Sequence, residues 1–259
     1  MRLNTAKRRM LAGKPALGVE VGLGSPLVAE ILSIAGFDFV QVDHQHGAWD
    51  YDTAMMAFRG ICYGTATPVA RVEQNDYYAI GHLLDRGTMG IVVPMVNSAS
   101  DAEAAAFAAR YPPRGGRSIG PFGAGLHGAR SEYRAQIDDE LFLAVQIETQ
   151  AAVDNAEEIL GVEGIDGCWV GPTDLAASLG VDPGTKEHEA AILHVLDACR
   201  KTKKIPGIAA AGASAGGAQK WLDRGFLYVV VGGDRHLLAA AALETLQKLG
   251  REPRKEARY

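Results

Sequence analysis

Apolar runs of four to seven residues alternate with segments of helical periodicity along most of the chain. Within the runs, apolar residues occupy consecutive positions, a pattern typical of strands buried on both faces of a parallel sheet. The runs predict eight strands, at Leu17–Gly22, Phe37–Val42, Thr67–Val72, Gly90–Val96, Leu141–Ile147, Gly167–Val170, Pro206–Ala210 and Tyr228–Val231. The periodic segments predict eight helices, at Pro26–Ala35, Tyr51–Cys62, Tyr77–Arg86, Ser100–Arg110, Ala151–Leu160, Lys186–Lys201, Ala215–Arg224 and Arg235–Leu249.

Eight strand-then-helix units in 259 residues predict an α/β fold, a (β/α)8 TIM barrel formed by one domain over residues 1–250. A charged tail, residues 251–259, follows this domain and lacks an apolar period. A doubly wound open sheet is the alternative, but no Gly-x-Gly-x-x-Gly follows the first strand. The connection Tyr111–Glu140 is long and unpatterned, which predicts a lid over the acceptor side of a site or a contact with another subunit.

Composition and charge exclude several classes of function. The net charge is −5 and no basic stripe with interleaved aromatic residues occurs, so nucleic acid is not an expected partner. No apolar stretch approaches the roughly 18 residues of a membrane-spanning helix, so no membrane span is expected. The cysteines, Cys62, Cys168 and Cys199, are odd in number and lack metal-binding spacing, which favours a reducing cytoplasm.

Two carboxylates follow predicted strands and carry the strongest chemical signal. Glu148 comes directly after Leu141–Ile147, and Asp174 comes shortly after Gly167–Val170. If these strands are parallel neighbours, the two residues emerge side by side, with backbones roughly 5 Å apart. Such a pair suits a hard divalent cation that keeps positions for water and substrate, whereas either acid alone would be an ordinary strand-end or cap residue.

Other polar groups also lie at the carboxyl ends of predicted strands, where barrel enzymes have their active sites. Arg71 opposite a metal can stabilise an oxyanion, and free N–H groups at the helix start after Gly171 can hold a carboxylate. No lysine occupies such a strand end, which disfavours imine chemistry and favours metal-assisted chemistry. The remaining groups of this set are His44 and His46, of which at most one need be catalytic, Gln146, and Gly232-Gly233-Asp234.

In their order and spacing these motifs resemble the metal-dependent (class II) pyruvate aldolases, which include 4-hydroxy-2-oxoheptanedioate aldolase and 2-dehydro-3-deoxyglucarate aldolase. The resemblance covers nearly the whole chain. Its most specific part is the pair Val145-Gln146-Ile147-Glu148-Thr149 and Val170-Gly171-Pro172-Thr173-Asp174-Leu175. The other matching segments are Phe37–Asp43 followed by His46, Pro68–Val72, Leu84–Gly87, Gly90–Val96 and Tyr111–Pro113.

The resemblance implies a homo-oligomeric barrel, usually a hexamer, that uses Mg2+, Mn2+ or Co2+. It implies that Glu148 and Asp174 bind the metal. Gln146 and the backbone around Thr173 and Asp174 would then contact a small-molecule 2-oxo acid.

For catalysis, the resemblance implies His46 as proton acceptor, Arg71 as transition-state stabiliser and Asp85 as the acid that raises the basicity of the histidine. The family often has Gly-Glu between the strand-two aspartate and this histidine, where this chain has His44-Gln45, so His44 is an alternative base. Asp85 falls at the far end of a predicted helix, which in a simple barrel is the face opposite the site.

These implications lead to a hypothesis of reversible aldol cleavage of 4-hydroxy-2-oxo acids through a metal-stabilised enolate, with pyruvate or hydroxypyruvate and an aldehyde as products. The uncharged segment 209–212 predicts tolerance for different aldehydes rather than a grip on a second carboxylate. One alternative is a non-catalytic binding protein on a retained barrel. Another is a malyl-CoA or citramalyl-CoA lyase of the citrate lyase β-subunit type, whose CoA phosphates would need a basic surface such as Arg114, Arg117, Arg130 and Arg134.

Overall fold

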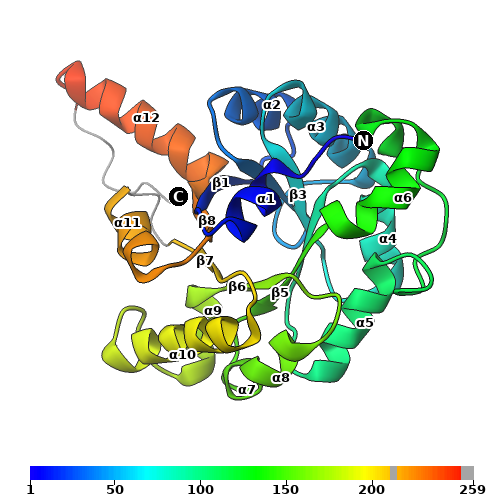
Figure 1. Ribbon diagram of the computed structural model, residues 1–259. Coiled ribbons are helices and arrows are strands. Elements are labelled where there is room, and N and C mark those ends of the chain that lie inside the picture. Colours follow the sequence, from blue (N-terminus) through cyan, green and yellow to red (C-terminus); the bar gives the residue numbers. More distant parts are fainter. Residues whose placement is uncertain (211–214, 252–259) are drawn as a thin grey trace.

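A closed barrel of eight parallel strands, joined in chain order, forms the centre of the molecule (Figure 1). This is a computed structural model, and it describes residues 1–210 and 215–251. The predicted (β/α)8 barrel is therefore confirmed, and each predicted strand is present. The strands are β1 (Ala16–Val21), β2 (Phe39–Asp43), β3 (Thr67–Arg71), β4 (Gly90–Val93), β5 (Phe142–Ile147), β6 (Gly167–Val170), β7 (Gly207–Ala209) and β8 (Tyr228–Gly233).

Helices surround the barrel, and each predicted helix has a counterpart. The predicted helix Ala151–Leu160 is divided at Asn155, whose side-chain amide donates to the Asn97 carbonyl at 2.9 Å. The described helices are α1 (Thr5–Leu11), α2 (Pro26–Ile34), α3 (Tyr51–Tyr63), α4 (Tyr77–Arg86), α5 (Ala99–Ala109), the 3-10 turn η1 (Ala124–His127), α6 (Arg130–Glu140), α7 (Gln150–Asp154), α8 (Ala156–Gly161), α9 (Pro172–Leu179), α10 (Lys186–Thr202), α11 (Ala215–Arg224) and α12 (Asp234–Lys248).

The barrel interior changes from apolar to polar along its axis. At the amino-terminal end of the strands Phe39 stacks on Tyr228 with ring centroids 4.2 Å apart, and a Cβ at Gly18 would overlap the Phe39 ring. Because successive side chains of a strand point to opposite faces, Glu20 faces the interior two residues beyond Gly18. Aromatic packing therefore fills the amino-terminal part of the barrel, and polar side chains occupy the carboxyl-terminal part.

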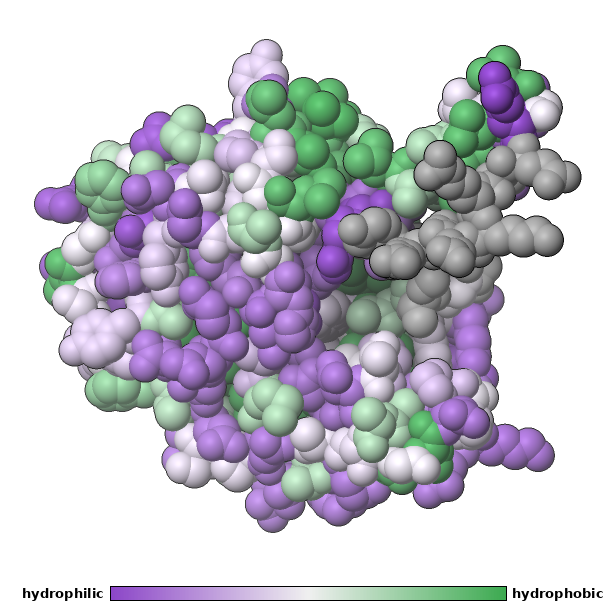
Figure 2. Space-filling model, turned by 180° about the vertical axis from the view of Figure 1, so that it is seen from behind, coloured by the Kyte–Doolittle hydropathy of each residue, from purple (hydrophilic) through white to green (hydrophobic). Residues whose placement is uncertain are grey.

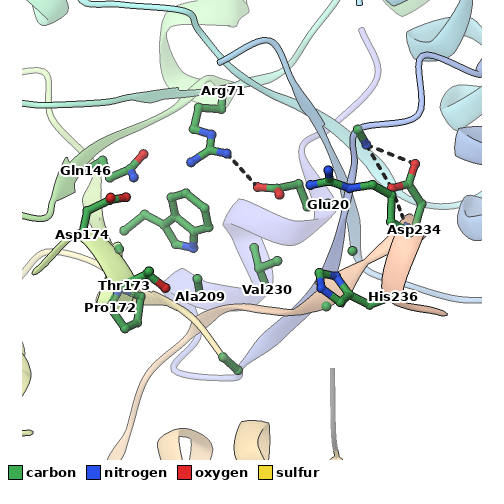
Figure 3. A pocket seen from close by; sticks show the side chains of 17 residues that line it. Glu20, Arg71, Gln146, Pro172, Thr173, Asp174, Ala209, Val230, Asp234 and His236 are labelled. Carbon is green, nitrogen blue, oxygen red and sulfur yellow. Dashed lines mark hydrogen bonds and ion pairs between the residues drawn. The ribbon is translucent and has the colours of Figure 1, made fainter. Parts of the chain in front are cut away.

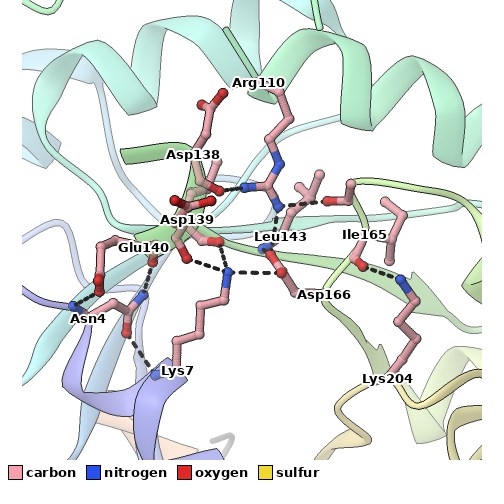
Figure 4. Close-up of polar contacts among 12 residues, drawn as sticks. Asn4, Lys7, Arg110, Asp138, Asp139, Glu140, Leu143, Ile165, Asp166 and Lys204 are labelled. Carbon is pink, nitrogen blue, oxygen red and sulfur yellow. Dashed lines mark hydrogen bonds and ion pairs between the residues drawn. The ribbon is translucent and has the colours of Figure 1, made fainter. Parts of the chain in front are cut away.

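Helix α1 covers the amino-terminal end of the barrel through a buried polar network (Figure 4). The Lys7 ammonium lies 2.9 Å from Asp166 and also donates to the carbonyls of Asp139 and Leu141. Arg110 binds the same Asp166 carboxylate at 2.8 Å. Burial lowers the pKa of Lys7, although Asp166 opposes this shift. The network makes this end of the barrel structural and leaves chemistry to the opposite end.

The segment Tyr111–Glu140 is not the unpatterned lid that was predicted. It contains η1 and α6, and it packs at the amino-terminal end of the barrel, beyond the last turn of α4. There Arg117 pairs with Asp85 at 2.8 Å, and His127 Nε2 lies 2.7 Å from the Gly87 carbonyl oxygen. Since the strand carboxyl ends lie at the other end, this segment does not cover the site of its own chain, and of the two predicted roles the contact with another subunit stays a prediction.

Helix α12 projects away from the barrel in Figure 1 and exposes apolar side chains, including Leu238 and Leu246. Beside it, α2 exposes Leu27 and Ile31, and Figure 2 shows the apolar surface that these two helices form. Within the described ranges no helix combines the length and the apolar character needed to cross a membrane. Of the predicted tail, all but Arg251 lies outside the described residues.

Candidate active site

A cavity of about 340 Å3 opens at the carboxyl ends of the strands (Figure 3). In the view of Figure 3, Gln146, Thr173 and Asp174 lie on one side of it, and Glu20 and His236 lie on the other. The polar and aromatic residues of its lining include Glu20, Arg71, Gln146, Trp169, Thr173, Asp174, Asp234, Arg235 and His236. Acidic, basic and amide groups from five different strands or their ends thus share one concave space.

The predicted carboxylate pair lies on neighbouring strands. Strands β5 and β6 are parallel, with Ile147 paired to Val170, so Glu148 and Gly171 follow adjacent positions. A Cβ at Gly171 would lie 2.9 Å from Glu148 Oε2, so only glycine lets the start of α9 approach this carboxylate. Burial, and then the charge of Asp174, raises the pKa of Glu148, which shows that the two carboxylates interact.

The two carboxylates differ in their partners. Glu148 is 2% exposed; its Oε1 accepts from the Met95 N–H at 2.9 Å, and its Oε2 accepts from the Gln146 amide. Asp174 lies in the first turn of α9 but does not cap it, because Gly171 is the N-cap residue and no side chain bonds there. In the described ranges the Asp174 carboxylate has no hydrogen bond or ion pair, so it is available to a ligand.

Two residues that line the cavity each have a buried polar atom without a hydrogen-bond partner among the described residues. Gln146 Oε1 and Trp169 Nε1 are buried and have no hydrogen-bond partner within residues 1–210 and 215–251. Buried polar atoms are nearly always paired in native proteins, so two orphans beside one cavity indicate a bound ligand or water. The Trp169 N–H suits a carboxylate or carbonyl oxygen of a small acid, whereas Gln146 Oε1 suits a hydrogen-bond donor or a cation.

The donor set fits a divalent cation. Glu148 and Asp174 supply carboxylate oxygens, which hard cations prefer, and Gln146 adds an amide oxygen. Among the described residues no group of three or more His, Cys, Asp and Glu side chains is arranged as a metal site. A cation held by only two carboxylates would therefore complete its coordination with water and substrate oxygens.

Arg71 ends β3 and is held in a fixed orientation. Its Nε and one terminal nitrogen donate to the two oxygens of Asp43 at 2.8 and 2.7 Å, and the same terminal nitrogen lies 3.3 Å from Glu20. The guanidinium carbon lies 5.1 Å from the centre of the Trp169 ring. Burial alone would lower the pKa of Arg71, but the Asp43 and Glu20 carboxylates outweigh burial and raise it.

The two histidines after β2 occupy different environments. His44 is buried, stacks on Tyr51 of α3 at 5.4 Å, and lies 3.5 Å from Glu73; burial lowers its pKa. It therefore faces the surrounding helices and not the cavity. His46 is exposed and is not a lining residue of the cavity, but the adjacent Gly47 packs against Gly22, which does line it.

One chain brings most of the predicted site residues together, but not all of them. Asp174, Gln146 and Thr173 form one side of the cavity, Glu148 lies behind Gln146 and is bonded to it, and Arg71 lies in the lining. Asp85 lies at the opposite end of the barrel, bound to Arg117. Within a single chain Asp85 is therefore remote from His46.

Sequence reasoning missed Glu20, the pairing of Asp43 with Arg71, and the polar side formed by Arg235 and His236. A charged residue inside an apolar strand run was the available signal for Glu20. Asp43 and Arg71 are directly paired across β2 and β3, which the two predicted strand ends could have indicated. Ala209 and Ala210 line the cavity as the uncharged segment 209–212 predicted, whereas 211 and 212 lie outside the described residues.

Comparison with known proteins gives a consistent picture. The sequence model of the HpcH/HpaI aldolase/citrate lyase family matches residues 18–241. The chain is 38% identical over 251 residues to 4-hydroxy-2-oxo-heptane-1,7-dioate aldolase of Escherichia coli, which covers 95% of each chain. A solved family protein from Burkholderia cenocepacia J2315 superposes with a TM-score of 0.88 at 29% identity, covering 95% of this chain and 99% of that one. The HpcH/HpaI aldolase from Desulfitobacterium hafniense DCB-2 gives a TM-score of 0.86 at 25% identity, with 95% and 97% covered.

Proposed function

Because the chain belongs to the HpcH/HpaI aldolase/citrate lyase family, we propose that it catalyses reversible aldol cleavage of 4-hydroxy-2-oxo acids. The products would be pyruvate or hydroxypyruvate and an aldehyde, the reaction of a class II aldolase among the carbon–carbon lyases. The observation that carries this proposal is one cavity in which Asp174 and Gln146, backed by Glu148, accompany the fixed guanidinium of Arg71.

Glu148 and Asp174 would hold a divalent cation, Mg2+, Mn2+ or Co2+. The unpaired Asp174 carboxylate and the orphaned Gln146 Oε1 support this assignment, since both are oxygen donors turned to the cavity. When bound, the cation supplies a Lewis-acid charge that makes the C3 protons of a bound 2-oxo acid easier to remove.

The chain's own groups would bind and orient the 2-oxo acid. The N–H groups of Thr173 and Asp174 lie in the first turn of α9, where backbone donors have no intrahelical acceptor, and they suit the substrate carboxylate. Arg71 would stabilise negative charge that develops on the enolate oxygen. Asp43 fixes the orientation of Arg71 before substrate arrives, so little reorganisation is needed during the reaction.

His46, whose exposed ring lies next to Gly47 beside the cavity, would accept the proton, because an imidazole can act as a general base. Asp85 cannot support His46 within one chain, since it lies at the other end of the barrel. We therefore propose that Asp85 of a neighbouring copy of the chain supports His46. Part of the segment Tyr111–Glu140 of that copy would reach the site with it.

A homo-oligomer, most simply a hexamer, agrees with the surface of α12 and α2. Helix α12 exposes Leu238 and Leu246, Leu249 is exposed directly after it, and the adjoining face of α2 exposes Leu27 and Ile31. Apolar surface of this extent between two helices marks an interface, and a second copy of the chain would cover it. The three cysteines are free thiols, which supports a reducing cytoplasm as the site of action.

The rival CoA lyase needs a basic surface near the cavity, and within one chain the four arginines that suggested such a surface do not lie there. Arg117 is buried on Asp85, and Arg114 pairs with Asp139 at 2.8 Å. Arg130 and Arg134 lie on α6, at the amino-terminal end of the barrel. Pyruvate release from a 4-hydroxy-2-oxo acid, measured beside CoA release from malyl-CoA, separates the two activities.

The test of the proposal is the metal requirement of pyruvate release. Treatment with a chelator should abolish release, and Mg2+, Mn2+ or Co2+ should restore it. Asp174→Asn should abolish it too, whereas Asp182→Asn, an exposed acid in the loop after α9, should not. Full activity after chelation, or borohydride trapping of a lysine with pyruvate, would contradict the metal-assisted reaction. A protein with no turnover under any metal would be a binding protein instead.

A further inference from the structure

Glu20 is a charged side chain placed inside the barrel at the cavity, and neither the metal nor the 2-oxo acid uses it. It lies on β1, on the side of the cavity remote from Asp174 and Gln146 in Figure 3. Its neighbours along the strand, Val19 and Val21, are fully buried in the apolar layer between strands and helices. The chain thus carries a carboxylate where an apolar residue would be the ordinary choice for a barrel strand.

A buried chain of hydrogen bonds holds this carboxylate in place. The Tyr228 hydroxyl donates to Gln41 Oε1 at 2.7 Å, which leaves the Gln41 amide nitrogen to donate to Glu20 Oε2 at 3.2 Å. The same oxygen lies 3.3 Å from a terminal nitrogen of Arg71. Three side chains from three strands therefore fix the orientation of Glu20 before any ligand binds.

The other carboxylate oxygen, Glu20 Oε1, has no hydrogen-bond or ion-pair partner in the part of the chain that the structure describes. The Glu20 side chain is 23% exposed, and it lines the cavity beside Arg235 and His236. Burial raises the pKa of Glu20 to about 6, and Arg71 opposes this shift, so the group is ionised at neutral pH. An oriented, ionised oxygen with a free lone pair recognises a hydrogen-bond donor.

We propose that Glu20 forms an acceptor subsite that binds a hydroxyl group of the aldehyde and selects hydroxylated aldehydes. This rests on the proposed aldolase function, and it identifies the acceptor as a short hydroxyaldehyde such as glycolaldehyde or glyceraldehyde. Glu20 accepts from the hydroxyl next to the carbonyl carbon, while Arg235 and His236 supply donors to further oxygens. The 2-oxo acid occupies the side formed by Gln146, Thr173 and Asp174.

A semialdehyde with a distal carboxylate is the competing occupant, and the charges of the subsite disfavour it. Glu20 would repel that carboxylate across the cavity. Asp234 adds a second carboxylate to this side, and its oxygens accept from the N–H groups of Gly22 and Leu23 at 3.0 to 3.1 Å. The arginines of the described lining are Arg71, which is already bound to Asp43 and Glu20, and Arg235, whose positive charge also acts on Glu20.

The experiment measures kcat/KM for the aldehyde with pyruvate as donor and Mn2+ present. Glycolaldehyde and propanal form a matched pair, because they differ only in a hydroxyl against a methyl group, and succinic semialdehyde tests the distal carboxylate. The wild type should prefer glycolaldehyde to both. Glu20→Gln should reduce the glycolaldehyde-to-propanal ratio about tenfold, since a neutral acceptor makes a weaker bond than a carboxylate, and Glu20→Ala should reduce it further. Asp182→Asn, an exposed acid outside the cavity, should leave the ratio unchanged.

An unchanged ratio in Glu20→Gln and Glu20→Ala would overturn the proposal. A wild-type preference for succinic semialdehyde that Arg235→Gln removes would overturn it as well, in favour of carboxylate recognition. Incorporation of deuterium from solvent into pyruvate, without any aldehyde, separates this failure from failure of the proposed function. If wild-type protein exchanges the donor protons while the acceptor ratio stays unchanged, the aldolase assignment stands and only the role of Glu20 is lost.

Discussion

Replacement of Arg71 by lysine tests whether the orientation of the guanidinium, and not only its charge, promotes the reaction. Arg71 is held by two parallel hydrogen bonds to Asp43 and by a longer contact to Glu20. A lysine keeps the positive charge but cannot form the two parallel bonds, because its donors radiate from one nitrogen. Its ammonium would pair with Asp43 and lie further from the cavity.

The magnitude follows from the loss of one oriented donor at the enolate oxygen. Removal of such a donor costs roughly 100-fold to 1,000-fold in kcat, or about 2.7–4 kcal/mol. Since lysine retains its charge, we expect the lower end, about 100-fold, with little change in KM. An uncharged replacement is less informative, because it would leave Asp43 buried and unpaired and cost roughly 3–5 kcal/mol of stability.

Steady-state release of pyruvate from a 4-hydroxy-2-oxo acid, coupled to its reduction, gives kcat and KM separately. Arg200→Lys is the matched control, because Arg200 also pairs with an aspartate, at 2.9 Å, but lies exposed on α10. Its kcat should equal that of the wild type. A kcat for Arg71→Lys within about threefold of wild type would refute the role of the oriented guanidinium, because the expected loss is about 100-fold.

Three further outcomes concern metal binding and stability. Mn2+ at 100 times its Kd should stabilise the wild type by about 2.7 kcal/mol and raise its Tm, and Asp174→Asn should lose this shift; an equal shift would place the metal elsewhere. Asp166→Asn should lower the free energy of unfolding in urea by about 3 kcal/mol, because it leaves two largely buried cations unpaired, whereas the exposed Asp197→Asn should cost under about 1 kcal/mol. Burial lowers the pKa of His127 to about 4, so stability present above pH 6.5 should fall by up to about 3 kcal/mol as the pH drops toward 4; a His127→Gln variant with the same pH dependence would contradict this.

The barrel could be predicted because its strands are uninterrupted apolar runs separated by helical periodicity. Helix α6 could not be predicted, because its sequence is mostly charged and only Tyr133, Ile137 and Glu140 are buried. The break between α7 and α8 depends on a tertiary hydrogen bond from Asn155 to Asn97, which local periodicity does not contain. Local patterns therefore predicted the repeated units, and contacts between distant segments decided the exceptions.

The candidate site was predictable where residues occupy strand ends. Glu148, Asp174 and Arg71 follow directly from the positions of β5, β6 and β3. Glu20 was missed because one charge in an apolar strand has no visible partner until the barrel closes and brings Gln41 and Tyr228 beside it. A contact between Asp85 and His46 requires two copies of the chain, so it could not be predicted from the pattern of a single chain.

The most direct test of the central claim is exchange of the C3 protons of pyruvate with deuterium oxide, followed by proton NMR in the absence of aldehyde. This measures enolisation alone, without acceptor binding or product release. Wild-type protein with Mg2+, Mn2+ or Co2+ should exchange these protons. The chelated protein and Asp174→Asn should not exchange them. Exchange that continues at the wild-type rate in the chelated protein and in Asp174→Asn would contradict the metal-assisted reaction.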